Sequence, residues 1–129
     1  MAILHLRPLI AAALLFSAGT AKAWTDAGLT PGVTRVRAVH LSEIVVAANA
    51  KLVSCGLSPA GAQAIGTVIR AADVNATRTS VNTLYLSFAQ PVPQYTDGAM
   101  VADRARIRAV YISELRAAVD AAASWPCPP

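Results

Sequence analysis

Two short patterns in this sequence have residue types and spacings that could carry chemistry. The first is His40 with Glu43. Side chains three positions apart on a helix share one face, where these two could act as metal ligands. A metal site or a nucleophilic triad needs more groups than these two, and His40 is the one histidine outside residues 1–23. We therefore expect a packing role for His40. A small exported enzyme or metal-binding protein centred on His40 and Glu43 is the alternative.

The second pattern is a pair of arginines, Arg35 and Arg37, which recurs as Arg106 and Arg108. Both pairs fall at predicted helix starts, where a cation opposes the helix dipole. Local pairing with carboxylates is the interpretation that we favour, because exposed arginines commonly find such partners. The other interpretation is an anion site, in which helix N–H groups and the arginines bind a carboxylate, sulfate or phosphate. The carboxylates available for local pairing are Asp26, Asp97, Glu43 and Glu114.

Three copies of one helical unit position these residues. Trp24 to Ala50 aligns without a gap with Tyr95 to Ala121, at an offset of 71 residues, and a weaker copy lies between them at an offset of 33. His40 corresponds to Asp73 and Tyr111 in the other copies. A recurring unit of this length is typical of a helical repeat, in which like positions have like packing roles.

Apolar residues recur at spacings of three and four over about residues 35–52, 68–87 and 105–124, which predicts three amphipathic helices. Thr34 and Thr67 are placed to cap the first two helices. A short fourth helix is predicted to follow a Ser58 cap, from Pro59 to about Ile65. The fold class is thus a small all-α bundle or array of three repeated amphipathic helices and one short helix, with short extended N-terminal segments. The predicted core-facing stripes are Val36, Val39, His40, Ile44, Ala47 and Ala48, then Ile69, Ala72, Ala76, Ser80, Val81 and Leu84, and then Ile107, Val110, Tyr111, Leu115, Ala118 and Val119. The side chains expected at the edge of the last helix or pointing away are Glu114, Arg116 and Asp120.

Residues 1–23 have the features of a secretory signal, with a basic start, an apolar run from Leu9 to Phe16 and small residues at Ala21 and Ala23. The apolar run is shorter than the roughly 20 residues that a membrane span needs. We expect cleavage near Ala23 and a secreted or periplasmic mature chain without a membrane span. Residues 24–129 are predicted to form one α-helical repeat domain.

The two cysteines, Cys55 and Cys127, follow the first and last predicted helices. Export favours a disulfide between them, with the C-terminal tail held by that bond alone. Removal of the signal lowers the formal charge from +4 to +2, which argues against a dedicated nucleic-acid binder. The sequence has no Gly-rich phosphate loop, Cys/His cluster or dinucleotide fingerprint. We expect no cofactor and no catalysis.

The repeated residues resemble a helical repeat of exported bacterial proteins, written Ile-Arg-Ala-x-His-[apolar]-x-Glu-Leu-Arg. In that family the unit usually lies in tandem at the end of larger secreted proteins, without established catalysis. The resemblance therefore implies a free-standing exported repeat module. This chain departs from the pattern at Val45 in place of Arg, Ala76 in place of Glu and Tyr111 in place of His. We expect a non-catalytic binding or scaffolding module of the cell envelope or extracellular space, whose partner is an envelope protein or an anionic surface polymer.

Overall fold

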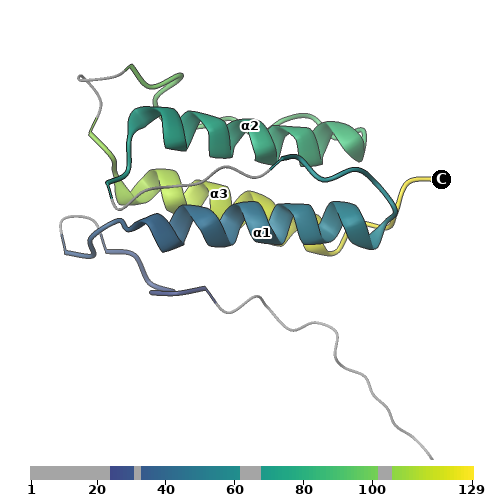
Figure 1. Ribbon diagram of the computed structural model, residues 1–129, viewed down its shortest axis with the longest axis horizontal. Coiled ribbons are helices and arrows are strands. Elements are labelled where there is room, and N and C mark those ends of the chain that lie inside the picture. Colours follow the sequence, from purple (N-terminus) through teal and green to yellow (C-terminus); the bar gives the residue numbers. More distant parts are fainter. Residues whose placement is uncertain (1–23, 31–32, 62–67, 102–105) are drawn as a thin grey trace, which may run out of the picture.

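Three helices pack around one apolar core, which confirms the predicted all-α fold class. A computed structural model describes residues 24–30, 33–61, 68–101 and 106–129, and the predicted signal peptide lies outside them. The helices are α1 (Ala38–Ser54), α2 (Ala71–Ser87) and α3 (Ala109–Ala123) (Figure 1). No helix in the described ranges combines the length and the apolar character that crossing a membrane requires. The largest fully buried apolar side chains are Leu41, Ile44, Leu52, Leu84, Ile112 and Leu115.

All three helices run in the same direction, and Figure 1 shows each of them beginning on the left. The residues just before the three helices line one pocket. At the opposite end, the Trp125 ring packs edge-on against Tyr85, with ring centroids 4.7 Å apart. A helix of this length spans about 25 Å, so the chain must return along the bundle before each new helix, which takes roughly eight extended residues. The connections at residues 55–70 and 88–108 are long enough to do so.

Each helix begins about three to four residues later than the apolar spacing predicts, at Ala38, Ala71 and Ala109. The predicted α1 cap is wrong, because the Thr34 hydroxyl accepts the Thr30 N–H at 3.0 Å within the preceding turn. The second predicted cap, Thr67, lies outside the described residues. Residues 58–61 are not helical, so the start of the predicted short helix is wrong, and its remainder lies outside the described residues.

Arginines occupy the N-cap positions instead, and they are capped from inside the helix. The Arg37 N–H donates to His40 Nδ1 at 3.0 Å, and the Arg70 N–H donates to Asp73 Oδ2 at 2.8 Å. A guanidinium has no acceptor, so it cannot accept a helix N–H in return. The cap therefore depends on the side chain at the third helical position, where the repeat has His40 and Asp73.

The predicted stripes are too narrow, because each helix contacts both others and buries a wider face. On α1, Leu41 and Val45 are buried, whereas Val39 is 37% exposed. On α3, Arg116 was expected at the edge but is only 5% exposed. Equivalent positions of the three repeats do share an environment. Val36, Ile69 and Ile107, which lie just before the three helices, are all half-buried against the core.

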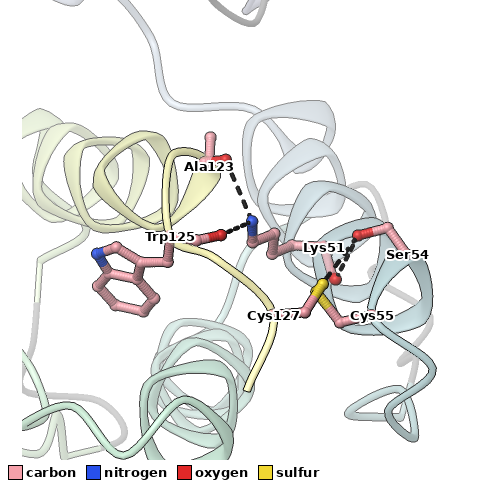
Figure 2. Close-up of a disulfide and its surroundings, with 6 residues drawn as sticks. All are labelled: Lys51, Ser54, Cys55, Ala123, Trp125 and Cys127. Carbon is pink, nitrogen blue, oxygen red and sulfur yellow. Dashed lines mark hydrogen bonds between the residues drawn. A yellow bond between two sulfur atoms is a disulfide. The ribbon is translucent and has the colours of Figure 1, made fainter. Parts of the chain in front are cut away.

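The predicted disulfide joins the ends of α1 and α3, with the Cα atoms of Cys55 and Cys127 5.3 Å apart (Figure 2). We expected from the sequence that this bond alone holds the C-terminal tail, and that expectation is wrong. Lys51 Nζ donates to the carbonyls of Ala123 at 3.2 Å and Trp125 at 2.5 Å. The Trp125 ring also packs against Phe88, at 5.6 Å between centroids. The C-terminal ends of all three helices are therefore tied together.

Reducing the disulfide should destabilise the domain without abolishing its helices. The bond closes a loop with a sequence separation of 72 residues, for which chain entropy predicts a loss of about 4 kcal/mol. Urea denaturation followed by circular dichroism, with and without reductant, measures this loss. The Cys55→Ser/Cys127→Ser variant is the control, and a midpoint that shifts with reductant in that variant would contradict the assignment.

Candidate functional site

Two lead-in segments, Trp24–Asp26 before α1 and Tyr95–Asp97 before α3, are held in the same way by their own helices. Glu43 accepts the Thr25 N–H at 3.1 Å and the Thr25 hydroxyl at 2.7 Å. Glu114 accepts the Thr96 N–H at 3.0 Å and the Thr96 hydroxyl at 2.6 Å. Each glutamate thus satisfies the backbone of the segment that precedes its helix.

Asp26 joins the first lead-in segment to the start of α1. Its backbone has a φ of 52°, in the left-handed region that aspartate tolerates better than most residues. Arg37 Nη2 donates to its Oδ2 at 2.6 Å, and His40 Nε2 lies 2.9 Å from the same oxygen. Because of the Arg37 bond first, and the His40 bond second, the pKa of Asp26 is lowered below its ordinary value of 3.8.

His40 is completely buried, and both of its ring nitrogens are occupied. Nδ1 accepts the Arg37 N–H, so Nε2 carries the proton and donates to Asp26. Glu43 is engaged by Thr25. Within the described ranges, no three His, Cys, Asp or Glu side chains lie together as a metal site would require. The geometry gives His40 and Glu43 a structural role, which favours the packing interpretation over the metal-binding alternative.

Asp97 repeats this arrangement before α3, with a φ of 57°. The Tyr111 hydroxyl, at the position of His40, donates to Asp97 Oδ2 at 2.6 Å, and Arg108 Nη1 donates at 3.1 Å. The Tyr111 bond, followed by that of Arg108, lowers the pKa of Asp97 below 3.8. Tyrosine therefore replaces the imidazole as a donor without loss of the contact.

Each lead-in segment is also bound by one buried arginine, which comes from another helix. Arg116 of α3 donates from Nη1 to the Asp26 carbonyl at 3.0 Å and from Nη2 to the Thr25 carbonyl at 2.5 Å. Arg78 of α2 donates to three carbonyls at 2.9 to 3.0 Å, those of Thr96 and Asp97 in the other segment and that of Gly98 directly after it. The Arg116 guanidinium lies 5.3 Å from the Trp24 ring centroid, and that of Arg78 lies 4.8 Å from the Tyr95 ring centroid. We call Arg78 and Arg116 the clamp arginines.

A second set of equivalent polar residues, one on each helix, shows that the contacts follow a cycle. Asn49 of α1 accepts the Ala60 N–H before α2 at 2.7 Å. Asn82 of α2 accepts the Tyr95 hydroxyl before α3 at 2.9 Å. Asp120 of α3 accepts Trp24 Nε1 before α1 at 3.2 Å. Each helix thus binds the segment that leads into the next one, and α3 closes the cycle on α1. The clamp arginines occupy one equivalent position, and Val45 of α1 stands in their place.

The four arginines predicted as a possible anion site lie together around one pocket of about 900 Å³. They come from two segments that are 71 residues apart in the sequence, immediately before α1 and α3. The pocket lies where all three helices begin, and its apolar lining was not foreseen in the sequence. The arginines are Arg35, Arg37, Arg106 and Arg108, and the apolar lining is Val36, Val68, Ile69, Ile107 and Ala109.

The electrostatics of this arginine-rimmed pocket are only partly balanced. The favoured local pairing holds for Arg37 with Asp26 and for Arg108 with Asp97. Within the part of the chain that the structure describes, no ion pair involves Arg35 or Arg106. Three parallel helices also direct the positive ends of their dipoles here, each equivalent to about half a charge. The described residues at this end of the bundle therefore carry a surplus of positive charge, which can attract an anion.

Comparison with protein-family models, with curated proteins and with solved structures finds no match to this chain.

Replacing a clamp arginine should destabilise the fold far more than replacing a rim arginine. Arg116→Ala leaves two carbonyls of the first lead-in segment without their charge-assisted hydrogen bonds, so we expect a loss of about 3 kcal/mol. Arg35→Ala, on the exposed rim, should change the stability by less than about 0.5 kcal/mol. Urea denaturation of both variants measures the difference. Equal losses would show that Arg116 does not hold the segment.

Lowering the pH should remove the stability that the two lead-in aspartates, Asp26 and Asp97, give to the fold. Their pKa values are lowered in the folded state, so the stability they add is present above pH 3.8 and is lost as the pH falls through their folded pKa values. Asp26→Asn/Asp97→Asn keeps a side chain that tolerates the left-handed backbone. The gap in urea midpoint between wild type and this variant should be wide at pH 6 and narrow at pH 2. A gap that stays constant with pH would contradict the assignment.

Proposed function

We propose that this protein is a non-catalytic, exported binding module of the cell envelope or extracellular space, and that it holds an anionic group in the arginine-rimmed pocket. One observation carries the proposal: two rim arginines without a carboxylate partner among the described residues, Arg35 and Arg106, face the same pocket as three helix N-termini. Helix N–H groups and guanidinium groups are the donors that carboxylates, sulfates and phosphates bind. The partner in this proposal is an envelope protein or an anionic surface polymer that carries such a group.

A binding role also accounts for how the polar residues are used. His40, Glu43 and Asp26 are engaged with the first lead-in segment or with the start of α1, so their hydrogen-bonding capacity goes into the fold. A catalytic histidine needs a free nitrogen that can exchange a proton with substrate. The alternative of an enzyme or metal-binding protein centred on His40 and Glu43 is therefore the weaker one.

Export is the second part of the proposal, and it draws on three features. The first 23 residues read as a secretory signal, and Cys55 and Cys127 form a disulfide of the kind that persists in oxidising compartments. The resemblance to an exported helical repeat points the same way. We place the mature chain in the periplasm or outside the cell.

Sulfate should stabilise the wild-type domain through the rim arginines. At ten times its Kd, a ligand that binds only the folded state adds about 1.4 kcal/mol, which raises the Tm of a domain of this size by about 6–11 °C. Arg35→Ala/Arg106→Ala should lose this rise, and a heparin titration should follow the same pattern.

A control variant separates the site from overall charge. Ala50→Glu/Ala117→Glu lowers the net charge by the same two units at exposed positions on the outer faces of α1 and α3. It should keep the response to sulfate. Identical Tm rises in wild type and in the rim variant would overturn the proposal.

A further inference from the structure

The arginine-rimmed pocket has an apolar interior that a purely ionic ligand would leave unused. Val36, Ile69 and Ile107 are equivalent residues of the three repeats, and all three are half-buried against the core. Val68 on the same pocket is 70% exposed. Such apolar surface gains free energy only when a ligand removes it from water. The pocket volume, about 900 Å³, lies within the range of small-molecule sites.

The charges of the pocket lie on flexible side chains around this apolar lining. Asp26 and Asp97 neutralise two of the four guanidinium groups, and those of Arg35 and Arg106 have no carboxylate partner among the described residues. These two residues are equivalent in the repeat and line the same pocket from different segments. A ligand that satisfies the whole pocket needs a single anionic head and an apolar chain.

We propose that the pocket binds an amphiphilic anion, with its carboxylate, sulfate or phosphate head at Arg35 and Arg106 and its acyl chain on Val36, Val68, Ile69 and Ile107. This inference rests on the proposed anion site and adds the chemical class of the ligand. An extended anionic polymer, by contrast, would contact the rim and leave the apolar lining in water.

A chain-length series of carboxylates below their micelle concentrations tests the inference by calorimetry on the mature protein. Acetate, hexanoate and octanoate share one head, and each buried methylene should tighten binding by about fourfold. Octyl glucoside carries the octyl chain without the charge. We expect octanoate to bind at least tenfold more tightly than both acetate and octyl glucoside. Octanoate and acetate affinities within a factor of two would overturn the inference.

Two matched variants test where the acyl chain of the ligand lies. Val68→Asn should weaken octanoate binding at least fivefold and leave acetate binding unchanged. Val46→Asn alters a valine that is similarly exposed, at 61%, on the outer face of α1, and should leave both affinities unchanged. Equal weakening by the two variants would indicate adsorption to exposed valines and would overturn the inference.

The failures of the two proposals are distinguishable. If sulfate and heparin bind through Arg35 and Arg106 but octanoate shows no gain over acetate, the anion site stands and the amphiphile is rejected. If none of the anions binds, both proposals fail. Binding to vesicles of anionic phospholipid is the last measurement. If the protein binds these vesicles but not monomeric octanoate, it is attracted to surface charge, and the proposal that the pocket binds an amphiphilic anion is rejected.

Discussion

The fold depends on the bonds between buried guanidinium groups and the backbone of the lead-in segments. Parallel helices need long returning connections, whose carbonyls have no helix or sheet to satisfy them. Arg78 donates to three carbonyls of the connection before α3, and Arg116 donates to two carbonyls of the segment before α1. Each guanidinium also lies against an aromatic ring of the segment that it binds. Each has a buried Nε without a hydrogen-bond partner in the described part of the protein, so its desolvation is offset by the remaining bonds and the ring contact.

The same constraint accounts for the positive end of the molecule. Because each helix holds the lead-in of the next one, all three must start at one end, and residues that precede the helices meet there. In an up-and-down bundle, α2 would run the other way, so Val68, Ile69 and the N-terminus of α2 would lie at the opposite end. Here Val68 and Ile69 share a pocket with Arg35 and Arg106, and the dipoles of all three helices add to the charge there. The pocket is thus a consequence of the helix direction.

The contacts around the segment before α2 depart from those before α1 and α3 in a coherent way. Val45 replaces the clamp arginine, Ala76 replaces the glutamate, and Pro59 stands at the position of Asp26. These three side chains belong to one group of contacts, which the other copies build around an Asp in the left-handed region. Without the arginine and the glutamate, the aspartate would have no cluster to join. Asn49 still binds the segment before α2, through the Ala60 N–H.

Much of this architecture could be predicted from local spacing. The sequence by itself determined the three helices, their repeat register and the pairing of Cys55 with Cys127, because periodicity and offset are properties of the chain alone. The burial of Arg116, and the pocket that Arg35 and Arg106 share with Val68 and Ile69, were not predictable in this way. The recurrence of Arg78 and Arg116 at one repeat position was the available signal for the clamp. Only the tertiary structure decided what these arginines do, because their surroundings depend on the direction in which neighbouring helices run, and the spacing within one helix carries no information about that direction.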